Sequence, residues 1–391
     1  MMSELHQLTR CKPSCYPVKH RYKDGFNPKI TVSKEFGPRV RKILELDMEL
    51  DRYILSATDH LDLLTEVYAS NIYWSTSLEG NPLSEDEVRI VTRDTLSGNM
   101  KESRNGPVQE VINHLICLHS PDAFCLPWSD PTICALNYLL LKGTGSSSTI
   151  GRYRDEPAMV GEPLTGEEHF IPAPPEWIPK EMSQLIQWTN DQALVYEPII
   201  AATVMSHEFE SIHPFADGNG RTGRSLFHLY LQQRALKNSH LCKIDHKLLE
   251  NKNLYYDLLA YTDQTGSYEE LIELVSIAVL KSYEEAQEAL SKKDLLSAGL
   301  DEASKRLLIK AKARKGYFSR KEAASWVDGM SEQTVGKRLN ELEEMGALES
   351  TGQTRAKRYR MKDPLANFKA VAMAVRKAES GEDVETPRVP R

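Results

Sequence analysis

Apolar residues recur at every third or fourth position between residues 37 and 77, beginning with Val40, Ile43 and Leu44. This spacing is typical of helices that pack one face against a core, and two helices fit the stretch. The sequence Glu-Gly-Asn-Pro at 79–82 interrupts the pattern, because glycine and asparagine favour helix ends. Ser84 and Glu87 have the spacing of a capping box, which predicts that another helix begins here.

Helical periodicity continues through the middle of the chain. Further helices are expected at residues 107–119, 131–142, 179–190, 198–212, 221–237, 246–263 and 272–290. Residues 143–148 have the composition of a flexible linker. Residues 153–175 mix glycine, proline and short apolar pieces, which is typical of a hairpin or flap. The body of the chain is therefore predicted to be mainly α with one small β element, without an internal repeat.

The pattern changes after residue 290. One helix is expected at 302–313, a second after the capping-box pair Ser319 and Glu322, and a third after Ser331. Residues 346–360 then read as two short strands joined by a glycine-containing turn. Three helices followed by a hairpin is the layout of a winged helix-turn-helix domain.

These patterns divide the 391 residues into segments, and a chain of this length is expected to hold two or three domains. The predicted segments are a surface extension at 1–36, a helical region at 37–106, a core at 107–290, a winged helix-turn-helix at 300–362 and a disordered tail at 376–391.

The composition is ordinary except for the distribution of charge along the chain. Apolar residues (40%) and charged residues (27%) have the shares of an ordinary globular protein, and the net charge of −7 disfavours non-specific nucleic-acid binding by the whole molecule. Residues 301–361, however, hold 14 Lys and Arg against 9 Asp and Glu, a local charge of +5 that leaves −12 for the remainder. No apolar run has membrane-spanning length and the start does not resemble a signal peptide, so a cytoplasmic protein without a membrane segment is expected.

Six scattered cysteines fit a reduced, cytoplasmic protein. Cys11 and Cys15 have the spacing of half a metal site, but a matching second pair is absent from the sequence. His114, Cys117 and His119 form a looser group, for which helix packing is a simpler explanation than metal binding.

The most informative segment is His-Pro-Phe-Ala-Asp-Gly-Asn-Gly-Arg-Thr-Gly-Arg at 213–224. Pro214 disfavours a helical conformation at His213, so the chain is expected to leave a helix there, with Phe215 plugged into the core. The glycines that follow let backbone N–H groups approach an anion, and a helix beginning at Arg221 would present its positive end to a pyrophosphate. A base, an acid, backbone donors and two arginines together suit nucleotide phosphate chemistry.

Three other interpretations of this region, a plain turn, a calcium loop and a zinc-protease helix, fit less well. Asp-Gly-Asn-Gly is also a common type of turn, and Asp217, Asn219 and Arg221 alternate as in a calcium loop. The twelfth position of such a loop would be His228 rather than a bidentate glutamate. His207-Glu208 suggests a zinc-protease helix, but Ser211 stands where the second histidine would be.

The segment resembles the Fic family signature, His-Pro-Phe-x-Asp/Glu-Gly-Asn-Gly-Arg-x-x-Arg, at every defined position, and the resemblance covers roughly residues 40–290. Members of that family transfer AMP from ATP onto a hydroxyl side chain of a target protein. The resemblance implies that His213 deprotonates the attacking Ser, Thr or Tyr, and that Asp217 holds Mg²⁺ between the α- and β-phosphates. The implied ATP-binding residues in the signature are Gly218, Asn219, Gly220, Arg221, Thr222, Gly223 and Arg224.

In that assignment the backbone from Gly218 to Arg221 forms the anion hole, and the side chains of Arg221 and Arg224 meet the distal phosphates. A relative that phosphorylates its target has a bulkier, lysine-containing loop here, so the Gly-Asn-Gly sequence favours AMP transfer over phosphate transfer. Tyr255 and Tyr256 resemble an aromatic pair beside adenine and ribose, with core packing as the alternative.

Two other segments extend the resemblance. Gly-Arg-Tyr-Arg at 151–154, with residues 160–172, is similar to a flap that holds the target segment by strand addition, although an ordinary surface hairpin is the alternative. Relatives often have Asn seven residues after the second tyrosine, where this chain has Asp263, so that contact is not carried over.

Ser75, Glu79 and Gly80 match the family's inhibitory motif, Ser/Thr-x-x-x-Glu-Gly/Asn, and Ser75 and Glu79 share one helix face. The resemblance implies that Glu79 pairs with Arg224, withholds it from the γ-phosphate and leaves ATP in a non-productive pose. In the family this glutamate is also associated with positioning a water that removes AMP.

The sequence therefore predicts an autoinhibited protein adenylyltransferase that uses ATP and Mg²⁺, with a hydroxyl-bearing protein, the chain itself included, as target. The alternative is a DNA-binding regulator whose Fic part senses ATP. Residues 300–362 would then contact DNA, with basic side chains on the expected wing: Arg355, Lys357, Arg358 and Arg360. Such a domain also serves as a target-docking or dimerisation module, so a homodimer stays open.

Overall fold

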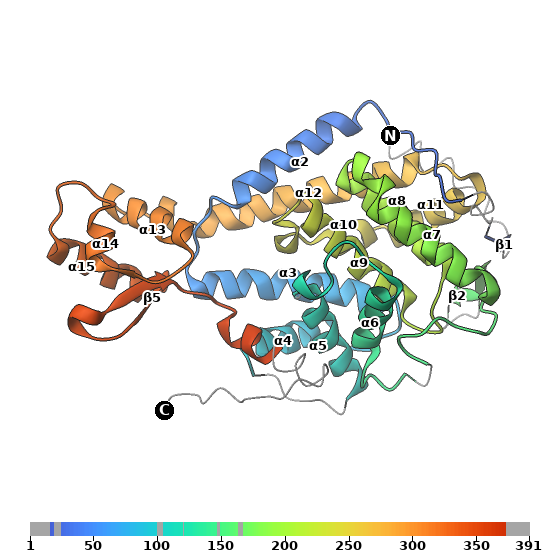
Figure 1. Cartoon of the computed structure of the whole chain (residues 1–391), viewed down its shortest axis with the longest axis horizontal. Helices are drawn as coiled ribbons and strands as arrows, with labels where there is room; N and C mark the ends of the chain where they lie inside the picture. Colours follow the sequence, from blue (N-terminus) through green and yellow to red (C-terminus); the bar gives the residue numbers. More distant parts are fainter. Residues whose placement is uncertain are drawn as a thin grey trace. The chain divides into compact units, whose positions relative to one another are not determined.

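The computed structural model describes residues 16–18, 25–99, 105–119, 121–146, 149–162 and 167–372 (Figure 1). Cys11, Cys15 and the tail at 376–391 lie outside these ranges. The chain forms two compact units. The first unit contains Met1–Met48, Val67–Thr92 and Glu102–Glu285, and the second contains Glu49–Glu66, Arg93–Lys101 and Ala286–Arg391.

The fold is mainly helical, as predicted. Among the described residues up to 293, the α-helices are α2 (Phe36–Leu50), α3 (Ala57–Ser77), α4 (Glu85–Leu96), α5 (Gly106–Leu118), α6 (Asp130–Leu141), α7 (Ile178–Asn190), α8 (Pro198–Ile212), α9 (Asn219–Arg234), α10 (Ile244–Leu249), α11 (Lys252–Thr265) and α12 (Glu269–Lys293). The short 3-10 helices in the described part of the chain are η1 (Pro121–Ala123), η2 (Pro175–Trp177), η3 (Gln192–Val195), η4 (Ser239–Leu241), η5 (Leu295–Ser297) and η6 (Thr354–Ala356).

Helices α8 and α9 form the centre of the first unit. They pack against each other, α7 packs on α8, and both α5 and α6 pack on α9 (Figure 1). Nearly every residue of α8 is buried, and α9 is buried from Asn219 to Leu231. A helix that is enclosed on all sides belongs to the interior of a domain. The 213–224 segment connects these two helices, so its position is fixed by the core of the unit.

Two differences from the expected helices lie close to the 213–224 segment or to the predicted tyrosine pair. The stretch predicted as one helix at 246–263 is α10 followed by α11, because Asn251 interrupts it and caps α11 by accepting a hydrogen bond from the N–H of Leu254 (3.2 Å). Helix α9 begins at Asn219 rather than Arg221, since Gly218 takes the left-handed conformation (φ 74°) that ends the turn before it.

A three-stranded sheet lies in the first unit, in the order β1 (Tyr16–Pro17), β3 (Glu167–Ile171), β2 (Val160–Glu162). β2 and β3 are antiparallel, which confirms the hairpin expected within 153–175, and β1 is parallel to β3. Within the expected surface extension at 1–36, Val18 and Phe26 are buried, and the Phe26 ring packs edge-on to Trp188 (5.4 Å between centroids).

The second unit contains α13 (Glu302–Arg314), β4 (Phe318–Ser319), α14 (Arg320–Ala324), α15 (Glu332–Glu344), β5 (Leu348–Thr351) and β6 (Arg358–Met361). The capping box of Ser319 and Glu322 opens α14, and Ser331 caps α15, as expected. β5 and β6 form the expected hairpin, and β4 adds a strand beyond it, in the order β4-β6-β5. The assignment as a winged helix-turn-helix stays a prediction.

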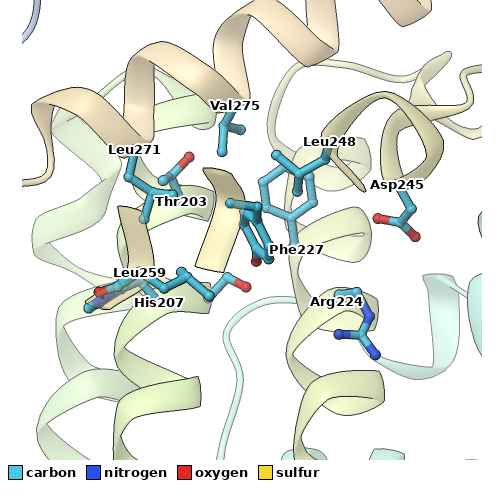
Figure 2. A pocket seen from close by; sticks show the side chains of 11 residues that line it. Thr203, His207, Arg224, Phe227, Asp245, Leu248, Leu259, Leu271 and Val275 are labelled. Atoms are coloured by element: carbon cyan, nitrogen blue, oxygen red, sulfur yellow. Dashed lines mark hydrogen bonds between the residues drawn. The ribbon is translucent and has the colours of Figure 1, made fainter. Parts of the chain in front are cut away.

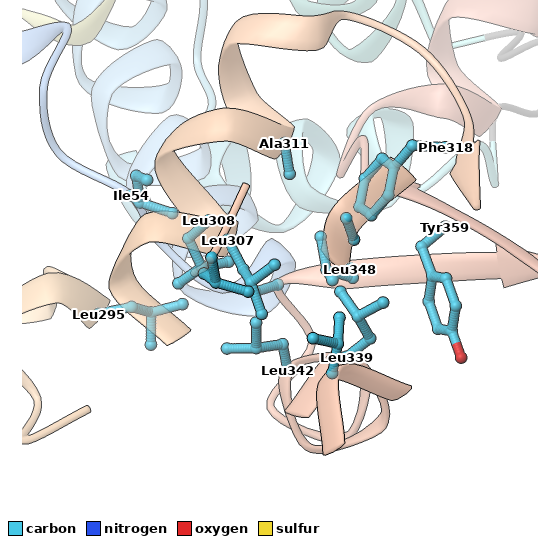
Figure 3. Close-up of a cluster of buried hydrophobic side chains, with 14 residues drawn as sticks. Ile54, Leu295, Leu307, Leu308, Ala311, Phe318, Leu339, Leu342, Leu348 and Tyr359 are labelled. Carbon is cyan, nitrogen blue, oxygen red and sulfur yellow. The ribbon is translucent and has the colours of Figure 1, made fainter. Parts of the chain in front are cut away.

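Leucines from α13 and α15 and aromatic rings from the strands form the core of the second unit (Figure 3). Leu307, Leu339, Phe318 and Tyr359 are all fully buried. Throughout the described ranges, no helix combines the length and apolarity that crossing a membrane would need.

Candidate active site

The loop after α8 starts with a strained residue. His213 ends the helix in the left-handed conformation (φ 50°), and its N–H donates to the carbonyl of Phe209 (2.9 Å). The expected helix exit at His213 is thus confirmed. A left-handed histidine is uncommon and occurs where surrounding structure enforces it. Phe215 provides part of that structure, because it is 1% exposed and packs near Phe209 and Tyr153.

Hydrogen bonds from outside the loop also hold His213 in place. The Nε of Arg154 donates to the carbonyl of His213 (2.8 Å), and the N–H of Arg154 donates to the carbonyl of Pro214 (2.9 Å). The resemblance placed Arg154 on a target-binding flap, and the structure gives this buried side chain an anchoring position behind the loop. The His213 ring lies edge-on to Phe170 of β3, with 6.2 Å between centroids. Burial lowers the pKa of His213 to about 4, so the imidazole is neutral at neutral pH.

Two asparagine side chains hold the loop in its conformation. Asn219 was expected as an ATP-binding residue, and Asn137 was not expected at the site. Asn219 accepts from the N–H of Phe215 (2.9 Å) and donates to the carbonyl of the same residue (2.8 Å), so its amide fastens the loop to itself. Asn137 of α6 donates to the carbonyl of Asp217 (3.0 Å) and to the hydroxyl of Thr222 (3.2 Å). Nothing in the local sequence around Asn137 marks it, because these two loop partners lie 80 and 85 residues away.

Glu79 and Ser75 both bind Arg224. The Nη2 of Arg224 lies 2.9 Å from Glu79 Oε1, its Nε donates to the Ser75 hydroxyl (2.8 Å), and Nη2 also donates to the Ser75 carbonyl (2.8 Å). The predicted contact between Glu79 and Arg224 is therefore present. Burial alone would lower the pKa of Arg224, but the carboxylates of Glu79 and Glu210 outweigh it and raise this pKa.

The Glu79 carboxylate lies directly above the first turn of α9. A Cβ atom placed on Gly220 would come within 2.0 Å of Glu79 Oε1, a distance that real atoms do not reach. The N-terminus of a helix is a natural anion site, because its N–H groups have no partner within the helix and its dipole is positive there. Glu79 thus occupies the place at which the sequence predicts a nucleotide phosphate.

Arg221 is also engaged by carboxylates. Its Nη1 lies 2.8 Å from Glu110 Oε1 and its Nη2 lies 2.7 Å from Asp217 Oδ1. The second oxygen of Asp217 accepts from the hydroxyl of Ser146 (2.7 Å). The guanidinium expected to meet distal phosphates is therefore bound to two carboxylates in this structure, and Ser146 of the expected linker reaches the site.

The two tyrosines differ in exposure. Tyr255 is 9% exposed and belongs to the core, whereas Tyr256 is 44% exposed, with the two ring centroids 5.8 Å apart. Asp263, which replaces the family's asparagine, is buried and accepts from the Ser211 hydroxyl (2.5 Å) and the Tyr16 hydroxyl (3.1 Å). It links α11 to α8 and to strand β1.

A small cavity lies among helices α8 to α12, bordered by Arg224, Tyr255, His207 and Asp245 together with mainly apolar side chains (Figure 2). Its volume of about 20 Å³ has room for about one water molecule and is far too small for a nucleotide.

The side chains of the 114–119 group have partners within the protein. Cys117 is buried in the core, and His119 bonds through Nδ1 to the Tyr68 hydroxyl (3.2 Å). Within the described ranges, no three His, Cys, Asp or Glu side chains converge as metal ligands would. Two of the basic side chains expected on a wing are paired with acids: Lys357 with Glu343 (2.8 Å) and Arg360 with Glu349.

The loop between α8 and α9 lies within a segment that matches a known protein family. Residues 127–231 match the model of the Fic/DOC family, so the chain carries a Fic/DOC-family domain. It is 25% identical over 242 residues to "Protein adenylyltransferase fic-1" of Caenorhabditis elegans, a match that covers 59% of this chain and 46% of that one. "Protein adenylyltransferase Fic" of Aedes aegypti is 25% identical over 205 residues, covering 51% and 38%.

The match thus spans about half the length, or less, of these curated relatives. Among solved structures, a Fic family protein from Desulfovibrio desulfuricans G20 has a TM-score of 0.57 and 23% sequence identity, covering 86% of this chain and 98% of that chain. This likeness supports the fold.

Proposed function

We propose that the protein transfers AMP from ATP to a hydroxyl side chain of a protein target, and that Glu79 restrains this reaction. The observation that carries the proposal is the position of the Glu79 carboxylate, which is bound to Arg224 and lies above Gly220 at the positive end of α9. The similarity to protein adenylyltransferases supports the same activity.

In the proposed reaction, neutral His213 accepts the proton of a Ser, Thr or Tyr hydroxyl. The hydroxyl oxygen forms a bond to the α-phosphorus of ATP, and the bond from that phosphorus to the bridging oxygen of pyrophosphate breaks. The products are AMP joined to the target and free pyrophosphate. Backbone N–H groups of the first turn of α9, next to Gly220, stabilise the charge on the phosphates.

Asp217 fits the role of a magnesium ligand. Its side chain is 34% exposed, and Mg²⁺ in nucleotide sites is usually held by one or two carboxylates together with phosphate oxygens. A metal bound there would neutralise charge on the phosphates. Ser146 and Arg221 orient the two Asp217 oxygens in the protein itself.

The restraint follows from two electrostatic effects. Glu79 forms an ion pair with Arg224, so the Arg224 guanidinium cannot donate a charge-assisted hydrogen bond to the γ-phosphate. Its carboxylate also repels a phosphate brought to the same helix end. ATP can then bind only with its phosphates displaced. In the family resemblance the same glutamate positions a water for AMP removal, so we propose hydrolysis of the AMP-protein bond as a second activity of the unmodified chain.

The position of a radioactive label distinguishes AMP transfer from phosphate transfer. We expect the Glu79→Gly protein to become labelled by ATP carrying the isotope at the α-phosphate and to stay unlabelled by ATP carrying it at the γ-phosphate. Label from the γ-position would instead identify a kinase, and no transfer from either would contradict the proposed function. A cell lysate added to the reaction, followed by mass spectrometry, identifies the target protein.

The acid limb of the pH profile tests the role of His213. A base is active when unprotonated, so activity is lost as pH falls through the pKa of that base. Because burial lowers the pKa of His213 to about 4, transfer at pH 5.5 should stay close to its value at pH 7.5. The measurement is kcat/KM against pH with the Glu79→Gly protein. A midpoint at or above the ordinary histidine value of about 6.5 would contradict this assignment.

Gly220→Ala distinguishes two effects at the start of α9: displacement of the inhibitory Glu79 carboxylate and access of a phosphate to the same place. The added methyl would displace the Glu79 carboxylate, but it would block a phosphate at the same place. We therefore expect Gly220→Ala to give no more AMP transfer than the unmodified protein. In the Glu79→Gly background, it should weaken ATP binding about tenfold, measured by calorimetry. Activation by Gly220→Ala alone would show that phosphate does not bind above this residue.

A further inference from the structure

A buried carboxylate connects the inhibitory turn to the loop that carries Asp217. Glu110 of α5 is 8% exposed, and its two oxygens bind different parts of the site. Oε2 accepts from the side-chain amide of Asn81 (2.9 Å), and Oε1 lies 2.8 Å from Nη1 of Arg221. None of these contacts was expected from the sequence.

Asn81 belongs to the same turn as Glu79. The residue between them, Gly80, has φ 86°, which a residue with a side chain rarely adopts. The Asn81 amide also donates to the carbonyl of Pro107 (3.1 Å) and accepts from the N–H of Leu83 (3.0 Å), so the turn is fastened at the start of α5. The position of the Glu79 carboxylate above α9 therefore depends on where Asn81 is held.

Arg221 continues the connection on the other side. Its second terminal nitrogen binds Asp217 Oδ1 (2.7 Å), and the Arg221 residue as a whole is 6% exposed. Removing one partner from a buried, hydrogen-bonded charge pair costs more than removing an exposed one, because the remaining charge has no water to bind. The four side chains of this network, Asn81, Glu110, Arg221 and Asp217, are thus expected to move together.

We propose that Glu110 is a positioning residue that couples the inhibitory turn to the anion-binding loop, so that displacement of Glu79 and rearrangement of Arg221 and Asp217 occur together. The significance of this coupling rests on the proposed function, but the coupling itself is a property of the protein without nucleotide. The turn at residues 79–81 is then attached at two points: Glu79 binds Arg224, and Asn81 binds Glu110. A partner that releases the turn also changes the environment of Asp217.

Hydrogen exchange of the full chain without nucleotide tests the coupling. Asn81→Ala should speed exchange of the backbone amides in residues 213–224 by about tenfold, the scale of one hydrogen bond to a charged group. The same substitution in a Glu110→Gln background should add less than about twofold, because contacting residues in one network are not additive. Glu85→Gln, at an exposed position of α4, is the matched control and should leave exchange at 213–224 unchanged.

Unchanged exchange at 213–224 in Asn81→Ala, or fully additive effects of the two substitutions, would overturn the coupling. Glu110→Gln preserves side-chain shape, and its thermal unfolding curve shows whether the fold is retained. Because no nucleotide is present, a protein that transfers no AMP but shows the predicted exchange contradicts the proposed function alone.

Discussion

Replacing Glu79 with glycine is expected to raise the rate of AMP transfer by about 10- to 100-fold, the range that one or two hydrogen bonds to a charged group provide. The variant removes the carboxylate that binds Arg224 at 2.9 Å and that lies above Gly220. Arg224 then becomes available to the γ-phosphate, and the positive end of α9 is open to an anion. Incorporation of α-labelled AMP into the protein itself or a target measures the change.

Glu79→Gln is the informative companion variant, because it keeps the shape of the side chain and loses its charge. It should give an intermediate rate, since it still fills space above α9 but no longer forms an ion pair with Arg224. Glu85→Gln controls for the loss of an acidic residue nearby. Equal rates for Glu79→Gly and the unmodified protein would show that Glu79 does not restrain the site.

Replacing His213 with alanine is expected to lower AMP transfer by about 100- to 10,000-fold, the usual contribution of a general base. The substitution is made in the Glu79→Gly protein, where activity is high enough to measure. ATP binding should be nearly unchanged, because the predicted anion contacts come from the start of α9 rather than from the imidazole. The loss should therefore appear in kcat and leave KM for ATP little altered.

His60→Ala provides a histidine control, since His60 belongs to the second unit. The melting temperature must be checked for His213→Ala, because His213 has an unusual backbone conformation (φ 50°). Full transfer activity in a folded His213→Ala protein would exclude this residue as the base. A rise in KM without a change in kcat would instead place His213 in nucleotide binding.

Local sequence determined much of the fold. Helix positions followed from apolar spacing and from caps such as Ser84, Ser319 and Ser331, because these signals act within four residues. The helix exit at His213 and the burial of Phe215 were predictable for the same reason. The break between α10 and α11 was missed because apolar spacing continues across Asn251.

The side chains that hold the site together were less accessible to sequence reasoning. Asn137, Arg154 and Glu110 each bind a residue of the 213–224 loop that lies 59 to 111 residues away along the chain. No local pattern encodes such a distance. Glu79 was an exception, since its match to a known motif named both the residue and its partner, Arg224. Strand β1 was missed because two residues, one of them Pro17, provide no alternation to detect.

Mass spectrometry of the intact protein after incubation with ATP and Mg²⁺ tests directly whether Glu79 restrains AMP transfer that depends on His213. We expect Glu79→Gly to gain the mass of one or more AMP groups, and Glu79→Gly combined with His213→Ala to gain none. The unmodified protein should gain much less than Glu79→Gly over the same time. An equal AMP mass gain in all three proteins would contradict the proposed restraint by Glu79. No AMP mass gain on Glu79→Gly itself or on the proteins of an added cell lysate would contradict the proposed AMP transfer.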